Sequence, residues 1–265
     1  MAEPEAPEPL ARWEGEPAEL WRTRWELPYL EIHARLGSTN DRARALLRGG
    51  CEPHSTVIAE EQTAGRGRAG RTWHSPPGAG LWLSTTFPGR GDEPGLTLLV
   101  GIAVARAIEE VAPGLRVEIE WPNDVVIDGG KVAGILCERL GAEGAGGVVV
   151  GIGVNVSQRV EDFGPAIRQR ATSLELATGS AVSRSSLAGA VLHELRRVPR
   201  REAGLPVEAW EALRERDALR GRLVEGSGGL RGLARGIALD GSLEVEVEGS
   251  VVSVRAGSVR PAGES

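Results

Sequence analysis

The spacing of hydrophobic and polar residues predicts strands and helices over most of the chain. Residues 29–36 and 80–87 alternate apolar and polar side chains, as half-buried strands do. Apolar residues between 96 and 111 recur every three or four positions, which predicts an amphipathic helix that ends at Pro113-Gly114. By the same criteria, further strands are expected over 55–59, 117–121, 125–127, 131–138 and 147–156, and further helices over 40–48, 185–198 and 207–217.

The pattern changes after Leu219, where short β segments are separated by turns. Apolar and acidic residues alternate over 243–248, and Asp240-Gly241 is typical of a hairpin. The chain is therefore predicted to be an α+β body followed by a small C-terminal β-barrel. We expect three parts, which cover residues 1–27, 28–218 and 219–265.

The N-terminal extension over 1–27 is rich in Pro, Glu and Ala, and its strong apolar anchors are three tryptophans. Its first dozen residues are expected to be disordered. A short helix is expected to begin near Pro17 and to pack on the body through Trp21 and Trp25.

Charge and composition exclude several classes of protein. The formal net charge of −6 argues against general nucleic-acid binding, which needs a basic face. No run approaches the roughly 18 apolar residues that span a bilayer, and the acidic start is not a signal peptide, so a cytoplasmic location is expected. Cys51 and Cys137 form neither a disulfide framework nor a CxxC pattern, and the four histidines lack metal-binding spacing. No protein-built metal site is expected.

An arginine loop connects the strands predicted over 55–59 and 80–87. Arg66, Arg68 and Arg71 are separated by glycines and one alanine, a combination suited to holding a carboxylate or phosphate. The alternative is an ordinary solvated or disordered segment. The loop also matches GxGxxG, but RTWHSPPG follows it and cannot start the helix that a dinucleotide site requires. We expect the loop to be mobile until a ligand arrives.

Lys131 is the only lysine in a chain with thirty arginines. A compact ammonium kept at a single site indicates a specific role, although one residue can also survive by chance. It follows the hairpin signal Asp128-Gly129 and opens the strand predicted over 131–138.

Six segments occur in a fixed order along the chain: Ser38-Thr39-Asn40, Gln62, GRGRAGRTW at 65–73, WPND at 121–124, KVAGIL at 131–136 with Glu138, and GIGVNV at 151–156. In this order and spacing they resemble the motifs of biotin protein ligases, which attach biotin to a carboxylase carrier domain. The resemblance covers about residues 30–261. It implies a mixed sheet flanked by helices, like that of class II aminoacyl-tRNA synthetases, and an SH3-like C-terminal domain.

The resemblance also implies a two-step reaction. The biotin carboxylate attacks the α-phosphate of ATP, which gives biotinyl-5′-AMP and pyrophosphate; a carrier lysine then attacks the activated carbonyl and releases AMP. Positive charge must hold the two anions together during the first step. ATP and biotin are the implied substrates, with Mg²⁺ expected alongside ATP.

The implied site residues fall into three overlapping groups. The expected catalytic residues are Lys131, Arg66, Arg68 and Asp124. The expected biotin contacts are Ser38, Thr39, Asn40, Gln62, Gly65, Arg66, Gly67, Arg68, Lys131, Gly134, Leu136, Gly151 and Gly153. The expected nucleotide contacts are Arg68, Arg71, Trp73, Asn123, Asn155 and Arg260.

Several of these residues also have purely structural interpretations. Ser38 is a candidate helix cap, and Trp73, expected to stack on adenine, would also suit a core. Asn123 and Asp124 make a good turn after Pro122; functionally, Asp124 would orient the incoming amine or a Mg²⁺-bound phosphate. Arg71 is a candidate anchor for the loop.

Two departures and two rival functions need to be considered. Glu120 stands where many members of the family have a lysine or arginine. The segment before Ser38 is too short, acidic and proline-rich for a winged helix-turn-helix, so we expect no DNA binding. The rivals are a lipoate or octanoyl protein ligase on the same fold and a non-catalytic biotin-binding sensor. The expected partner is a biotin carrier domain, and the protein is expected to be a monomer or homodimer.

Overall fold

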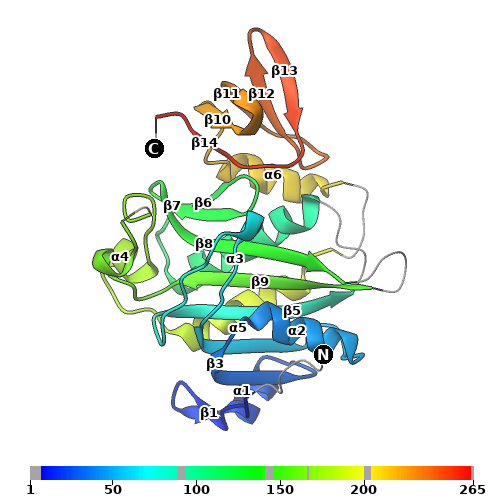
Figure 1. Cartoon of the computed structure of the whole chain (residues 1–265), viewed down its shortest axis with the longest axis vertical. Coiled ribbons are helices and arrows are strands. Elements are labelled where there is room, and N and C mark those ends of the chain that lie inside the picture. The colour runs from blue at the N-terminus through cyan, green and yellow to red at the C-terminus, as the bar shows by residue number, and fades with distance from the viewer. Residues whose placement is uncertain (1–6, 89–93, 141–145, 166, 200–203, 264–265) are drawn as a thin grey trace.

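The computed structural model describes residues 7–88, 94–140, 146–165, 167–199 and 204–263 (Figure 1). The α+β prediction is confirmed: the body is a mixed sheet with helices on both faces, and a second, smaller sheet follows it. The C-terminal sheet lies at one end of the molecule and the N-terminal segment at the other.

Seven strands form the main sheet in the order β3-β4-β5-β9-β8-β7-β6. Their bounds are β3 Leu30–Leu36, β4 Thr56–Gln62, β5 Gly80–Pro88, β6 Val117–Glu120, β7 Asp124–Ile127, β8 Gly130–Arg139 and β9 Gly147–Asn155. Only β3 and β4 pair in parallel, because α2 crosses between them; the other neighbours are antiparallel. The strand predicted over 55–59 extends to Gln62, because its last residues pair with the end of β3.

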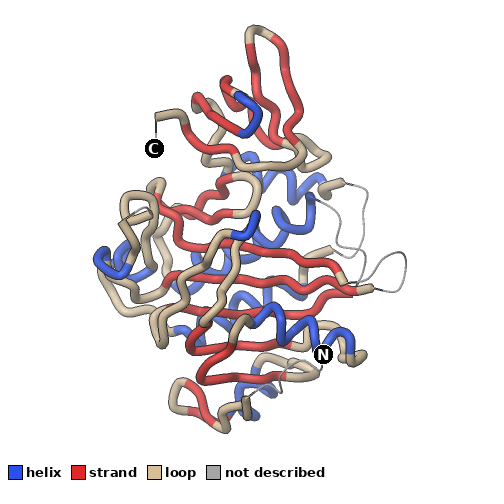
Figure 2. Tube along the Cα trace, in the orientation of Figure 1, coloured by secondary structure: helices blue, strands red, loops and turns tan. Residues whose placement is uncertain are grey.

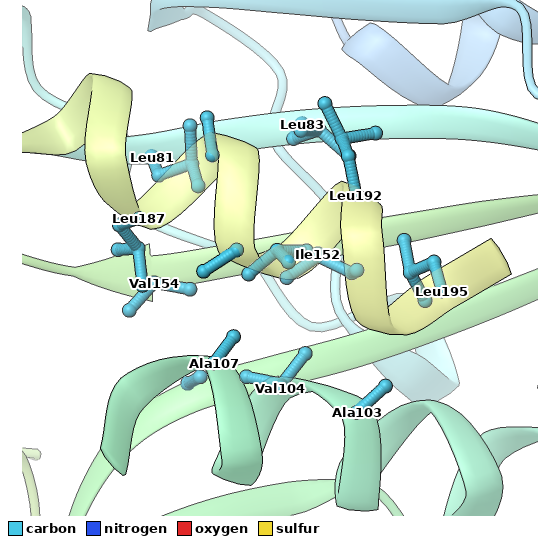
Figure 3. Close-up of a cluster of buried hydrophobic side chains, with 14 of the residues drawn as sticks. Leu81, Leu83, Ala103, Val104, Ala107, Ile152, Val154, Leu187, Leu192 and Leu195 are labelled. Atoms are coloured by element: carbon cyan, nitrogen blue, oxygen red, sulfur yellow. The ribbon is translucent and has the colours of Figure 1, made fainter. Parts of the chain in front are cut away.

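Helices α3 (Pro94–Val111) and α5 (Arg184–Arg196) pack on one face of the sheet. Figure 3 shows leucines of α5 and small residues of α3 interleaved with apolar side chains of β5 and β9. Helix α2 (Thr39–Arg48) covers the opposite face through Ala43, against Val57 and Val149. The alternation in β5 follows directly from this layering, because its successive side chains point to opposite faces.

The N-terminal segment packs on the edge of the sheet at β3. Trp13, Trp21 and Trp25 form one buried aromatic cluster, with Trp21 and Trp25 stacked at 5.2 Å. The segment contains β1 (Arg12–Trp13), β2 (Glu16–Pro17) and the expected helix α1 (Ala18–Arg24). Disorder through the first dozen residues is wrong for Leu10, whose amide donates to Ile32 O at 2.6 Å. Residues 1–6 lie outside the described residues.

The C-terminal strands form an open antiparallel sheet in the order β13-β12-β11-β10-β14. The bounds are β10 Leu223–Gly226, β11 Arg231–Ile237, β12 Leu243–Val247, β13 Ser250–Val254 and β14 Val259–Pro261. No pairing joins β13 to β14 in the described part of the chain, so a closed barrel is not confirmed. The sheet is fastened to the body by Trp121, which donates to Gly241 O at 3.0 Å, and by α6 (Val207–Arg216). The sequence pattern missed the short helix α4 (Leu174–Thr178).

A buried ion pair links β3 to α2. Glu31 is 3% exposed and accepts two hydrogen bonds from Arg42, at 2.6 and 2.7 Å, and one from the Tyr29 hydroxyl at 2.7 Å. His33 Nε2 lies 3.0 Å from the same carboxylate. Burial alone would raise the pKa of Glu31, but the hydrogen bonds from Arg42, His33 and Tyr29 outweigh it and hold this pKa well below its usual range.

The substitution Glu31→Gln is expected to lower the free energy of unfolding at pH 7 by about 3 kcal/mol, because it leaves Arg42 without its buried counter-charge. The gap to the wild type should narrow as the pH falls below 4.5, the ordinary pKa of a glutamate. There the unfolded wild-type chain takes up a proton that the folded state binds poorly, so only the wild type loses this stability. Urea denaturation at several pH values measures both effects.

The matched control is Glu61→Gln, which removes a carboxylate from a more exposed pair with Arg35 at 3.2 Å. It should change the free energy of unfolding by less than about 1 kcal/mol. A Glu31→Gln effect no larger than that of the control would contradict the assigned role of the buried pair.

Candidate active site

A cavity of about 330 Å³ lies between the body and the C-terminal sheet. The start of α2, the β4–β5 loop, strands β7 to β9 and residues 257–260 contribute to its wall. The cavity brings together every predicted site residue except Gly65: Ser38, Thr39, Asn40, Gln62, Arg66, Gly67, Arg68, Arg71, Trp73, Asn123, Asp124, Lys131, Gly134, Leu136, Gly151, Gly153, Asn155 and Arg260.

One end of the cavity is a cluster of hydroxyl and amide groups at the start of α2. Gln62 Oε1 accepts from the backbone amide of Thr39 at 2.9 Å and from its hydroxyl at 3.0 Å. The Ser84 hydroxyl lies 2.6 Å from Asn40 Oδ1 and 2.7 Å from Thr39 Oγ1. Ser38 is the N-cap residue of α2 by position, but its side chain makes no capping hydrogen bond. This end suits a flat polar group with both donors and acceptors.

The floor of the cavity is formed by strand backbone at glycine positions, which have no side chains. Gly134 of β8 lies directly opposite Gly153 of β9, and Trp73 covers both. A Cβ at Gly153 would lie 2.5 Å from Trp73 Nε1, and a Cβ at Gly134 would lie 2.8 Å from its Cζ3. Gly151 makes room for Asn40 in the same way. These glycines are therefore needed for the packing of Trp73 and Asn40, in addition to any role in ligand binding.

Charged groups gather beside this floor. Lys131 Nζ pairs with Asp124 Oδ1 at 2.7 Å and lies 5.1 Å from the centre of the Trp73 ring. Arg68 donates to Asn123 Oδ1 at 3.2 Å, and Asn123 in turn donates to Ile135 O. Burial lowers the pKa of Arg68, which remains a cation because an arginine starts so high. Two cations and one carboxylate thus face the same space.

The arginine loop folds back on itself across the sheet face (Figure 2). Trp73 N donates to Gly65 O at 2.9 Å, and Gly67 N donates to Arg71 O at 2.7 Å. A Cβ at Gly65 would lie 2.5 Å from Trp73 O, so this glycine is required for the loop to close rather than to line the cavity. Arg71 donates to Arg68 O at 3.3 Å, in keeping with an anchoring role.

Arg66 makes ion pairs that the sequence did not reveal. Its guanidinium forms a bidentate pair with Asp41, at 2.6 and 2.7 Å, and also lies 3.4 Å from Glu138. These ion pairs tether the loop to α2 and β8, and Arg66 also lines the cavity. Arg68 is the loop arginine that lies beside Lys131 and Asp124.

Asn155 also has a structural task that the sequence did not reveal. Its side-chain amide donates to Thr172 O at 3.0 Å and to Lys131 O at 3.4 Å, and its oxygen accepts from Gln158. Only the second lone pair of that oxygen is left for a nucleotide.

Several polar residues at the site were not among the predicted site residues. Ser84 belongs to the polar cluster, and Glu120, Gln158 and Arg170 line the cavity. In the sequence, Ser84 is only one residue of an alternating strand pattern, and Gln158 and Arg170 lie in a segment without a periodic pattern. The sequence carried no signal for Ser84, Gln158 and Arg170, since their places depend on contacts between distant parts of the chain.

Comparison with known proteins agrees with this geometry. Residues 33–155 match the Biotin/lipoate A/B protein ligase family. The biotin--[acetyl-CoA-carboxylase] ligase of Mycobacterium tuberculosis is 37% identical over 245 residues, which cover 87% of this chain and 88% of that protein. The chain belongs to the biotin protein ligase family. The resemblance drawn from its motifs is confirmed.

Other biotin protein ligases differ more in length or sequence. The bifunctional ligase/repressor BirA of Bacillus subtilis is 41% identical over 173 residues, covering 63% of this chain and 51% of that protein. The chain spans about half the length of this relative and of a second BirA. The biotin protein ligase of Aquifex aeolicus, solved with biotin and ATP, superposes with a TM-score of 0.77 at 28% identity, over 89% of this chain and 100% of that chain.

None of the helices in the described ranges is both long enough and apolar enough to cross a bilayer. Within the same ranges, no group of three or more His, Cys, Asp or Glu side chains is arranged to hold a metal ion.

Removing the Asp41 carboxylate should loosen the arginine loop. A partly exposed ion pair is worth about 1 kcal/mol or less, so Asp41→Asn should make opening of the loop about two- to fivefold more frequent. Limited trypsin digestion measures this directly, because cleavage after Arg66, Arg68 or Arg71 requires the loop to open. The control is Asp128→Asn, the same charge change at an exposed hairpin position. Equal cleavage rates in the two variants would show that Asp41 does not hold the loop.

Proposed function

We propose that the protein attaches biotin to a specific lysine of a carboxylase biotin carrier domain, with ATP as the second substrate and biotinyl-5′-AMP as the intermediate. The observation that carries this proposal is the juxtaposition of Lys131, Arg68 and Asp124 beside the glycine floor, in one cavity with the polar cluster of α2. The named relatives support the same activity.

The two ends of the cavity correspond to the two ends of biotin. The hydroxyl and amide groups of Thr39, Asn40 and Gln62 can exchange hydrogen bonds with the ureido ring, which has both N–H and C=O groups. The apolar chain would cross the floor of Gly134 and Gly153 beside Trp73 and bring the carboxylate to Lys131. Adenine would stack on an open face of the same indole.

In the first step, a carboxylate oxygen attacks the α-phosphorus, and the bond from that phosphorus to the bridging oxygen of the β-phosphate breaks. Lys131 and Arg68 stabilise the negative charge that is shared between carboxylate and phosphate. Asp124 holds the Lys131 ammonium 2.7 Å away, so its position is set before the anions arrive. The loop, fastened by Arg66, keeps water from the mixed anhydride.

In the second step, the carrier lysine attacks the carbonyl carbon as a neutral amine, the bond to AMP breaks, and the amine loses a proton. Asp124 is the carboxylate placed to orient this amine once Lys131 has moved to the phosphate.

Mg²⁺ is expected to accompany ATP, and the residues present fit that arrangement. Asp124 lines the cavity, whereas no protein-built metal cluster occurs in the described ranges. Carboxylates that supplement substrate phosphates are usual for this ion, which neutralises phosphate charge.

The remaining features of the proposal concern the organisation of the chain. We infer that residues 28–218 form the aminoacyl-tRNA synthetase-like catalytic domain, that 219–265 form an SH3-like module, and that 1–27 are an extension. The module supplies Arg260 to the cavity, where we expect it to reach the nucleotide. We further propose a monomer or homodimer in the cytoplasm that does not bind DNA. A shift of its own operator DNA in a gel at physiological salt would contradict the last point.

Biotin-dependent exchange between ATP and pyrophosphate tests the first step, and transfer of biotin to a purified carrier domain tests the second. Both are expected with biotin. Exchange with lipoate or octanoate but not with biotin would favour the lipoate-type rival. Tight binding of biotin without AMP formation would favour a sensor.

The substitution Lys131→Arg should lower the exchange rate about 100-fold, or about 2.7 kcal/mol of transition-state stabilisation. The larger planar guanidinium cannot occupy the position of the ammonium between Asp124 and the reacting anions. The matched control is Arg159→Lys, at an exposed residue outside the cavity, which should exchange at the wild-type rate. An unchanged rate for Lys131→Arg would remove Lys131 from the mechanism.

A further inference from the structure

Glu120 and Arg170 face each other in the wall of the cavity and have no part in the reaction described above. Arg170 Nη2 lies 3.5 Å from Glu120 Oε1. Glu120 ends β6, immediately before Trp121, and Arg170 lies in the segment between β9 and α4. The pair therefore brings together two segments fifty residues apart in the chain.

The backbone of Arg170 is fixed relative to Lys131. Lys131 N donates to Arg170 O at 2.7 Å, and Thr172 N donates to Lys131 O at 2.9 Å. Asn155 bonds to the carbonyls of both Thr172 and Lys131, which fastens the two segments together. These hydrogen bonds therefore fix the backbone of Arg170 relative to Lys131, the lysine expected at the α-phosphate.

The balance of positive and negative charge in the cavity indicates a role for Arg170. The proposed reaction brings three phosphates into the cavity, and two of them leave as pyrophosphate. Arg66 is already paired with Asp41 and Glu138, and Lys131 and Arg68 are assigned to the carboxylate and the α-phosphate. Charge accumulates on the leaving group as the bond breaks, so a further cation beside the β- and γ-phosphates would stabilise it.

The contact between Arg170 and Glu120 is a loose one. Arg170 Nη2 and Glu120 Oε1 are 3.5 Å apart, whereas Arg66 meets Asp41 through two bonds of 2.6 and 2.7 Å. Arginine binds phosphate oxygens through parallel N–H bonds, so a triphosphate can compete with this carboxylate for the guanidinium.

We propose that Arg170 binds the β- and γ-phosphates of ATP and then the departing pyrophosphate, and that Glu120 holds the guanidinium at the cavity wall when no triphosphate is bound. This assignment rests on the proposed ligase function. It gives Arg170 a role in nucleotide and pyrophosphate affinity, and none in biotin binding or in transfer to the carrier.

The test is steady-state exchange kinetics on Arg170→Gln, with Arg168→Gln as the control. Arg168 belongs to the same turn but does not line the cavity. Loss of a charged hydrogen-bond donor to phosphate should raise the KM for ATP and for pyrophosphate about tenfold or more. The KM for biotin should stay unchanged, as should the rate of transfer to the carrier from added biotinyl-5′-AMP. Arg170→Lys should recover part of the nucleotide affinity.

A double-mutant cycle isolates the part played by Glu120. Glu120→Gln alone should lower the KM for ATP about two- to fivefold, because it releases the guanidinium from a competing carboxylate. In the Arg170→Gln background the same change should have no such effect.

The possible results of these assays separate the role of Arg170 from the ligase function. A KM for ATP in Arg170→Gln equal to that of the wild type or of Arg168→Gln would overturn the assignment, while leaving the ligase function intact. An equal rise in the KM for biotin would show that Arg170 only supports the fold of the site, and would overturn it too. Absence of exchange in the wild-type protein would instead overturn the proposed function itself.

Discussion

Two glycines that face each other on neighbouring strands set the geometry of the site. Gly134 of β8 and Gly153 of β9 face each other in register, which lets the indole of Trp73 lie where two side chains would otherwise stand. The loop that carries Trp73 comes down on the sheet at this point, and Lys131 lies 5.1 Å from the same ring. The shape of the cavity and the positions of Trp73 and Lys131 therefore depend on these two glycines.

The charges of the site are arranged by pairing before any anion is present. Lys131 is held by Asp124, Arg66 by Asp41 and Glu138, and Arg170 by Glu120. A charge in a partly dry cavity is costly unless it has a partner, and each of these three cations has a carboxylate beside it. The pairs differ in geometry: Arg66 and Asp41 form a bidentate pair that anchors the loop, and the contact between Arg170 and Glu120 is longer, at 3.5 Å.

The smaller parts of the chain support this arrangement from two sides. The N-terminal segment covers the β3 edge, where the Leu10 amide donates to Ile32 O, and its tryptophans belong to the same buried core as Ile32. This edge would otherwise offer unpaired backbone groups to another chain. The C-terminal sheet is fastened through Trp121, next to the WPND turn, and places Arg260 at the cavity. A movement of this sheet would thus shift Asn123 and Asp124, which follow Trp121 in the chain.

The sequence by itself determined the elements and the family. Local alternation predicted β3, β5 and α3 closely, because a side chain's environment in such elements follows from its position along one strand or helix. Nearly every site residue that the ordered motifs indicated also lines the cavity. Only the tertiary structure decided how these residues are used. Arg66 and Arg68 look alike in sequence, yet one pairs with Asp41 and Glu138 while the other faces Lys131 and Asp124. The choice depends on carboxylates up to 72 residues away, which only the packing of α2 and β8 brings within reach.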